Sequence, residues 1–276
     1  MYSAPQSIDE TVRLLAEGGA TILAGGTDVY PSLQGGALDG PVIDISGLPD
    51  LRGISTSGGH FRIGALTCWS AILHADLPPA FRALQTAAGQ VGGVQIQNAG
   101  TIAGNLCNAS PAADGIPPLL ILDASVELRS AEKTRVLPLS EFLLGVRQIA
   151  LAKGELVTAV LIPTPPEDSK SAFVKLGARK YLVISIGMAA ALVRLDSKGR
   201  IAQARVAIGA CSPVATRLTQ LESDLVGQDP NNPVVTERHL AALSPIDDAR
   251  GTKEYRLRAA AEICRRAIIS AGCANG

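Results

Sequence analysis

Two glycine-rich segments carry the residue types best suited to binding phosphate. The first, AGGTD at residues 24–28, places Gly25 and Gly26 before Thr27 and Asp28, directly after a short apolar run. Two glycines let the backbone turn sharply, so successive amides and the threonine hydroxyl can point at one anion. A plain turn between a strand and a helix fits the same letters, and the segment alone does not decide between the two.

The second segment, TIAGN at residues 101–105, combines small residues with the Thr101 hydroxyl and the Asn105 amide. It lies in a stretch rich in Gly, Asn, Ser and Pro, residues 98–118, which predicts an irregular functional loop. Two such segments in one domain would bracket the two phosphates of a dinucleotide from opposite sides. The alternative is a structural loop in which Ile102 and Leu106 fill the core.

Asp114 ends a third segment, SPAAD at residues 110–114. Its carboxylate can accept hydrogen bonds from sugar or ribityl hydroxyls. An Asx turn ahead of Pro117 and Pro118 is the equally good alternative.

Other chemistry is not indicated. The sequence contains no G-x-G-x-x-G, no P-loop and no G-x-S-x-G motif. The three histidines, His60, His74 and His239, are far apart, and Cys107 has the features of a small buried thiol. A dinucleotide site without an acid, base or nucleophile cluster indicates a cofactor that does the chemistry itself.

Composition narrows the class of protein further. There are 25 basic and 25 acidic residues and only 3% aromatics, which disfavours nucleic-acid binding. The five cysteines are scattered without a C-x-x-C pair, so no metal or iron–sulfur site is predicted on this chain, and a reducing cytoplasm is expected. Neither a secretory signal nor a membrane span is predicted.

The element pattern predicts an α+β fold in two parts. Ser7 and Glu10 form a capping box that begins a helix, and strands are expected at 20–24, 41–45, 61–66 and 155–162. Prolines between 163 and 166 mark a domain boundary. Beyond it, two apolar runs at 184–195 and 201–209 predict a hairpin, followed by helices at 218–226 and 255–269.

Taken together, these residues resemble the flavoprotein, or medium, subunits of the molybdenum hydroxylases, the xanthine dehydrogenase family. The resemblance rests on AGGTD, TIAGN and SPAADGIPPLLILDA at 110–124, and less strongly on the segments at 175–192 and 207–218. It implies a two-lobed vanillyl-alcohol-oxidase-like FAD-binding domain over residues 1–166, with lobes 1–55 and 56–166. A C-terminal α+β domain with an antiparallel sheet and helices would follow at 167–276.

The resemblance also implies roles for individual residues. The first two segments would hold the pyrophosphate of noncovalent FAD, and Ser110 and Asp114 would contact the ribityl or phosphate region. Ile22 and Leu23 would line the adenine end. Lys175, Tyr181 and Leu182 would lie near the isoalloxazine. The implied cofactor-binding set is Ile22, Leu23, Ala24, Gly25, Gly26, Thr27, Asp28, Thr101, Ile102, Ala103, Gly104, Asn105, Ser110, Asp114, Lys175, Tyr181 and Leu182. Ala103 stands where the family commonly has glycine.

The implied function is electron transfer through FAD from [2Fe-2S] clusters on a small subunit to an external acceptor. A large subunit would hold the molybdenum–pterin cofactor, in a heterotrimer or a dimer of heterotrimers. The cysteine-rich insertion of 4-hydroxybenzoyl-CoA reductases is absent from this sequence, which favours a hydroxylase. The alternatives are a stand-alone FAD-dependent oxidase or reductase, and a non-enzymatic scaffold whose flavin site has decayed.

Overall fold

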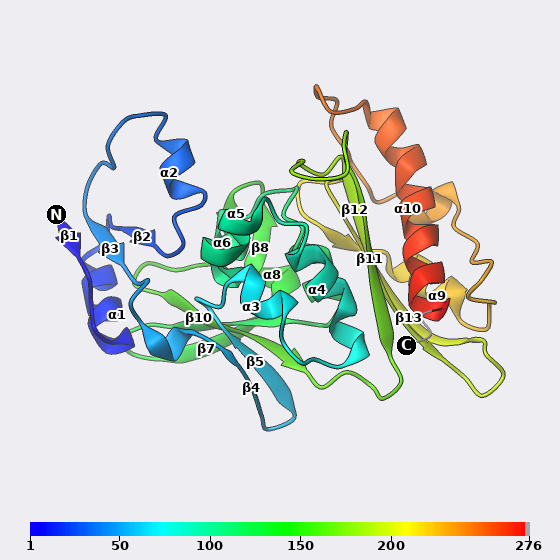
Figure 1. Cartoon of the computed structure of the whole chain (residues 1–276), viewed down its shortest axis with the longest axis horizontal. Coiled ribbons are helices and arrows are strands. Elements are labelled where there is room, and N and C mark those ends of the chain that lie inside the picture. The colour runs from blue at the N-terminus through cyan, green and yellow to red at the C-terminus, as the bar shows by residue number, and fades with distance from the viewer. Residues whose placement is uncertain (274–276) are drawn as a thin grey trace.

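A small parallel sheet begins the computed structural model, which describes residues 1–273 (Figure 1). The strand order is β1–β3–β2, and the apolar side of the first helix packs against this sheet. The elements are β1 (Tyr2–Ser3), α1 (Ile8–Glu17), β2 (Thr21–Leu23), α2 (Val29–Ser32) and β3 (Val42–Asp44). Ser7 caps α1 as predicted, because its hydroxyl accepts the amide of Glu10 at 3.1 Å.

The second sheet is antiparallel, with five strands in the order β4–β5–β10–β6–β7. Its strands are β4 (Ile54–Ser57), β5 (His60–Gly64), β6 (Ser125–Arg129), β7 (Thr134–Pro138) and β10 (Leu156–Pro163). Helices fill the chain between β5 and β6: α3 (Trp69–Leu73), α4 (Arg82–Ala88), α5 (Val94–Ala99), α6 (Ile102–Asn108) and α7 (Ile116–Ile121). The short elements are η1 (Pro49–Leu51), η2 (Pro79–Phe81), α8 (Leu139–Phe142), β8 (Leu143–Gly145) and β9 (Gln148–Ile149).

The third sheet, β11–β12–β13–β14, is antiparallel and contains the predicted hairpin. Helix α10 covers one face, and α4 and α7 from the preceding part of the chain pack on the sheet as well (Figure 1). The elements are β11 (Lys170–Leu176), β12 (Gly187–Leu195), β13 (Ile201–Gly209), β14 (Thr216–Arg217), α9 (Thr219–Leu225), η3 (Glu237–Leu240) and α10 (Lys253–Cys273). The α+β class predicted from the element pattern is confirmed.

The predicted irregular loop at 98–118 is wrong for most of its length, because it contains α6 and α7. Thr101 is the N-cap of α6, and its hydroxyl accepts the Gly104 amide at 3.0 Å. Pro117 and Pro118 lie in the first turn of α7, where a missing amide hydrogen costs no helical hydrogen bond. Residues typical of loops therefore begin helices here.

The predicted domain boundary at 166/167 falls between β10 and β11 and stays a prediction. One buried cluster crosses this point, since Phe173, Met188 and Leu192 pack with residues of α3, α4, α6 and α7. Asp123 at the end of α7 also pairs with Arg205 at 2.8 Å and Arg217 at 2.7 Å. Packing and charge therefore join the two parts along α7.

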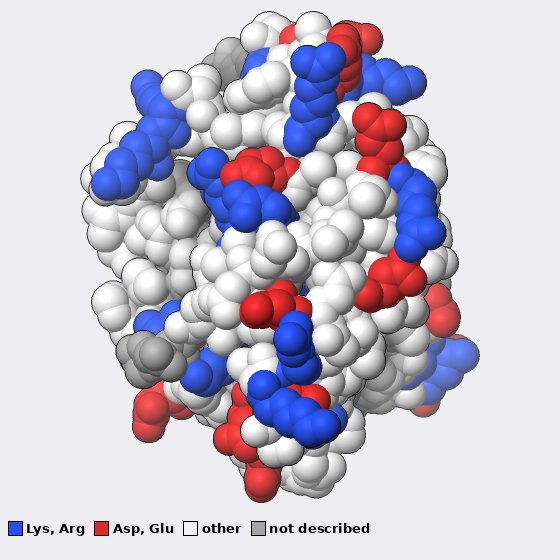
Figure 2. Space-filling view, turned by 90° about the vertical axis from the view of Figure 1, so that its right-hand side faces the viewer, with Lys and Arg blue, Asp and Glu red and all other residues white. Residues whose placement is uncertain are grey.

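The surface that includes the α10 side of the molecule shows basic and acidic side chains interspersed (Figure 2). Neighbouring ion pairs on α10 account for part of this mixture, for example Arg258 with Glu254 and Arg266 with Glu262. Within residues 1–273, no helix has the length and apolar character that crossing a membrane requires.

Arg256 is the one arginine of α10 whose side chain is almost fully buried, with 2% exposed. Its guanidinium donates to the carbonyls of Ile186 at 2.6 Å and Ala210 at 3.1 Å, and to Asp248 at 2.6 Å. Hydrogen bonds from Arg250 and Arg256 hold the pKa of Asp248 down at about 2. Arg256 thus fastens α10 to the start of β12 and the end of β13.

Replacing Arg256 with methionine should lower the free energy of unfolding by about 1–3 kcal/mol, because two buried carbonyls lose their donor. Urea unfolding measures this, with Arg258→Met on the exposed face of α10 as the matched control. Asp248 contributes stability while it is ionised and bonded, so the wild-type advantage should fade as pH falls from about 4 towards 2. Equal stability of the two variants would contradict the assignment.

Candidate functional site

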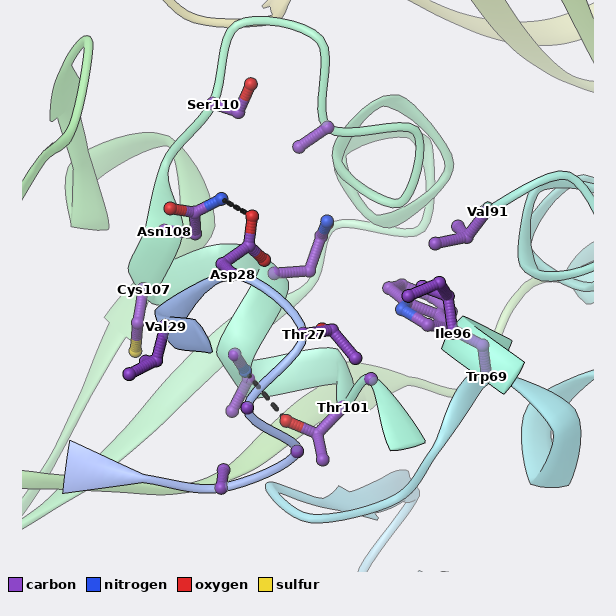
Figure 3. A pocket seen from close by; sticks show the side chains of 18 of the residues that line it. Thr27, Asp28, Val29, Trp69, Val91, Ile96, Thr101, Cys107, Asn108 and Ser110 are labelled. Atoms are coloured by element: carbon purple, nitrogen blue, oxygen red, sulfur yellow. Dashed lines mark hydrogen bonds between the residues drawn. The ribbon is translucent and has the colours of Figure 1, made fainter. Parts of the chain in front are cut away.

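A cavity of about 780 Å³ lies where the first sheet meets helices α5 and α6. This volume falls within the range of about 300–1,000 Å³ that small-molecule and cofactor sites occupy. Figure 3 shows the labelled side chains of Thr27, Asp28, Thr101 and Asn108 gathered around it. The walls come mainly from three stretches, namely residues 24–29, 91–114 and 182–184, with further apolar residues from β10.

The glycine turn, residues 24–28, forms one side of the cavity directly after β2. Gly25 lies against the C-terminal end of α5, since a Cβ built on Gly25 would lie 1.9 Å from the Ala99 carbonyl oxygen. Gly26 has a φ of +69°, which glycine adopts without strain. The Asp28 carboxylate accepts a hydrogen bond from the side-chain amide of Asn108 at 2.8 Å (Figure 3). The sequence turns here because only glycine fits the close approach and the left-handed backbone.

The threonine turn, residues 101–105, forms the facing side. Its start is fixed by the capping hydroxyl of Thr101, drawn as a dashed line in Figure 3, and by the Ile102 amide, which donates to the Thr67 carbonyl at 3.0 Å. The two turns approach each other closely, because a Cβ on Gly100, the residue before the threonine turn, would lie 3.2 Å from the Thr27 hydroxyl oxygen. The structure therefore brings together the two segments that the sequence separates by 73 positions.

Asn105 provides the test of whether the cavity suits a polar cofactor. Its Oδ1 atom is buried and has no hydrogen-bond partner among the described residues, yet Asn105 lines the cavity. Buried polar atoms in proteins are almost always paired, so a lone acceptor at a cavity wall indicates a donor supplied by a ligand or water. A ribityl or ribose hydroxyl would meet this need, and the residues therefore fit FAD.

Asp114 belongs to a buried ion-pair cluster that we define as Asp114, Lys175 and Ser185. Lys175 Nζ lies 2.6 Å from one carboxylate oxygen of Asp114, and the Ser185 hydroxyl donates to the other at 2.5 Å. Lys175 also donates to the Gln90 carbonyl at 3.2 Å. Burial raises the pKa of Asp114, while Lys175 and Ser185 oppose that rise. The Asx turn considered for Asp114 is not formed, because its carboxylate accepts from these two side chains.

This cluster joins three of the cavity walls. Asp114 is itself a wall residue, Gln90 precedes Val91, and Ser185 follows Ile184. Asp114 and Lys175 side chains each keep only 8% of their surface exposed. The cluster therefore sets the spacing of walls that come from the α6–α7 connection, from the α4–α5 connection and from the segment before β12.

The sequence-predicted residues divide into two groups. Thirteen line the cavity: Ile22, Ala24, Gly25, Gly26, Thr27, Asp28, Thr101, Ala103, Gly104, Asn105, Ser110, Asp114 and Leu182. Four lie outside the lining. Leu23 and Ile102 are buried in the core, Lys175 lies behind Asp114, and Tyr181 is 68% exposed, with the Lys180 ammonium 5.1 Å from its ring centre.

Other wall residues were not predicted from the sequence to bind a cofactor. The added residues include Val29, Ile45, Trp69, Val91, Gly92, Gly93, Ile96, Cys107, Asn108, Arg147, Leu151, Leu156, Val157, Val183 and Ile184. Most are apolar and carry no motif. Gly93 had a signal, because Gly92-Gly93 interrupts a helical pattern; a Cβ there would lie 3.1 Å from the Leu182 side chain. Burial raises the pKa of the Cys107 thiol to about 12, so it stays protonated and unreactive.

Comparison with known proteins identifies the family. Residues 1–165 match the family model for the FAD binding domain in molybdopterin dehydrogenase, and residues 172–271 match that for the CO dehydrogenase flavoprotein C-terminal domain. The chain therefore belongs to the FAD-binding subunits of the molybdenum hydroxylase family.

Individual relatives agree with this membership. A putative xanthine dehydrogenase FAD-binding subunit of Escherichia coli is 31% identical over 283 residues, covering 100% of this chain and 97% of the relative. The nicotinate dehydrogenase FAD-subunit of Eubacterium barkeri is 36% identical, covering 90% and 85%. A chain in the crystal structure of Cu,Mo-CO dehydrogenase superposes with a TM-score of 0.91 at 28% identity, over 98% and 96%. The predicted FAD-binding fold with a C-terminal flavoprotein domain is confirmed.

Proposed function

We propose that this chain holds noncovalent FAD in the cavity and relays electrons within a molybdenum hydroxylase complex. The observation that carries the proposal is the facing pair of turns, with the unpaired Asn105 oxygen between them and α7. FAD supplies the electron-transfer chemistry when bound, and the chain's task is to bind it, orient it and limit access of water.

The individual contacts follow from the walls. Amides of the glycine turn and of the threonine turn would hold the pyrophosphate, with the Thr27 hydroxyl as a further donor. Ile22 lies beside Ile45 and Leu156 at an apolar end suited to the adenine. Ser110 and Asp114 would contact the ribityl or phosphate region. Val91, Val183 and Ile184 would surround the isoalloxazine, with Lys175 paired to Asp114 nearby and Tyr181 and Leu182 near the outer edge.

The partners are proposed from the relatives. The names of its relatives include FAD-binding, medium and alpha subunits of xanthine, nicotinate, carbon monoxide and 6-hydroxypseudooxynicotine dehydrogenases. By this likeness, electrons would reach the chain from [2Fe-2S] clusters on a small subunit, after oxidation of substrate at a molybdenum–pterin centre on a large one. A heterotrimer, or a dimer of heterotrimers, in the cytoplasm would contain all three. The five free cysteines suit that reducing compartment.

The purified chain should show a flavin absorption spectrum and release about one FAD per chain on acid treatment. A tagged chain expressed in its own cell should then retain an iron–sulfur and a molybdenum subunit. A colourless chain that also takes up no added FAD would refute the cofactor proposal. Turnover of a small organic substrate by the isolated chain would instead favour a stand-alone oxidase.

A further inference from the structure

The cavity has an unbalanced distribution of charge. Of the lining residues within the described range 1–273, Arg147 alone is basic, whereas Asp28 and Asp114 are acidic. Asp114 is already paired with Lys175 at 2.6 Å. Asp28 is bonded to the neutral amide of Asn108. Over residues 1–273, no carboxylate oxygen lies within 4.0 Å of the Arg147 guanidinium, so its charge has no protein counter-ion.

Hydrogen bonds link Arg147 to the end of α6 and, through Asn108, to the glycine turn. Arg147 occupies the tight connection between β8 and β9 with a φ of +59°, an unusual backbone for an arginine. Its amide donates to the Ala109 carbonyl at 3.0 Å, and its guanidinium donates to the Asn108 carbonyl at 3.3 Å. The Asn108 side chain in turn bonds Asp28, so the arginine is linked through one residue to the turn.

This placement matters because backbone amides carry no net charge. A diphosphate held by the glycine turn would bring two negative charges next to the Asp28 carboxylate, and amides alone cannot neutralise them. A guanidinium binds phosphate oxygens through two parallel hydrogen bonds and stays ionised at any physiological pH. Among the described residues, Arg147 has the only lining side chain that can supply this charge.

We propose that Arg147 binds the diphosphate of the dinucleotide and is the main counter-charge of the site. The inference rests on the proposed FAD-binding function and adds to it a residue outside the glycine turn and the threonine turn. The left-handed backbone, which costs free energy in any residue with a side chain, is then explained as the means of directing the guanidinium along the end of α6.

The test compares ligands with and without the diphosphate. Arg147→Gln removes the charge but keeps a polar side chain with an amide donor and the same backbone requirement. The affinity of the purified full-length Arg147→Gln chain for FAD, measured by flavin fluorescence, should fall about tenfold to a hundredfold. Binding of riboflavin, which has no phosphate, should change by less than about twofold. Arg147→Lys should recover part of the FAD affinity, and Arg82→Gln, an exposed arginine outside the cavity, should bind FAD as the wild type does.

Each outcome has a separate meaning. Wild-type protein that binds no FAD would overturn the proposed function and this inference with it. Wild-type binding with an unchanged Arg147→Gln affinity would overturn the role of Arg147 alone. Equal weakening of FAD and riboflavin, with lysine no better than glutamine, would show that Arg147 only supports the fold of the β8–β9 hairpin, and would also overturn the proposal.

Discussion

Replacing Gly25 with alanine should lower the affinity of the chain for FAD by about a hundredfold or more. The added methyl carbon would lie 1.9 Å from the Ala99 carbonyl oxygen and 2.6 Å from the carbonyl carbon. These are backbone atoms at the end of α5, so no side-chain rotation relieves the clash. The glycine turn must move away from the threonine turn, and the amides that face one phosphate site then separate. A fluorescence titration with FAD measures the loss.

Substitutions at two further glycines should give smaller losses of FAD affinity for comparison. At Gly104 the added carbon would lie 2.8 Å from the Thr101 hydroxyl, which can rotate, so Gly104→Ala should bind FAD with an intermediate affinity. At Gly47 nothing lies within 4 Å, and Gly47→Ala should bind as the wild type does. Circular dichroism of all three variants separates misfolding from lost binding. If the folded Gly25→Ala protein keeps wild-type affinity, the two turns do not form the phosphate site.

The order of these effects could not be predicted from the sequence. The letters AGGTD indicate a phosphate turn, but they do not show that Gly25, and not Gly26, lies against another segment. That contact depends on where α5 ends, 74 positions later in the chain. By contrast, the β12–β13 hairpin was predictable, because two apolar runs and the intervening polar residues determine it locally; Asp196 accepts the amides of Lys198 and Arg200 in the turn.

The sequence also did not predict where some helices begin or which single charged residues enter the site. Thr101, singled out from the sequence, lines the cavity, yet its role as a helix cap was missed because the surrounding glycines and asparagines are typical of loops. Arg147 follows no motif, and only the fold places it in the cavity wall. His239, which no motif in the sequence distinguishes, is buried; its ring accepts the Thr236 backbone amide at 3.0 Å and contacts Asp224 at 3.0 Å. The bond to Thr236 is local, whereas the contact with Asp224 depends on how η3 packs against α9, which the local sequence does not encode.

Replacing Lys175 with methionine should reduce the free energy of unfolding by about 3–5 kcal/mol, the usual cost of leaving one buried charge without its partner. Methionine has a similar length and fills the same space, so the loss reports the charge and its bonds to Asp114 and Gln90. Urea unfolding of the FAD-free protein at neutral pH gives the value. Lys180→Met, at an exposed lysine five residues further along the chain, is the control and should change little.

The dependence on pH then identifies Asp114 as the unpaired group. Burial already raises the pKa of Asp114 in the wild type, and removing Lys175 takes away the main opposing influence. A carboxyl whose pKa is raised by folding binds more protons in the folded state than in the unfolded state, so stability falls as pH rises. The deficit of Lys175→Met should therefore shrink as pH is lowered from about 8 to about 5. Adding Asp114→Asn should restore most of the lost stability and remove this pH dependence.

A deficit that stayed constant with pH and survived in the double variant would mean that Lys175 stabilises the cavity walls through its bond to Gln90 and its packing. Asp114 would then not be its essential partner.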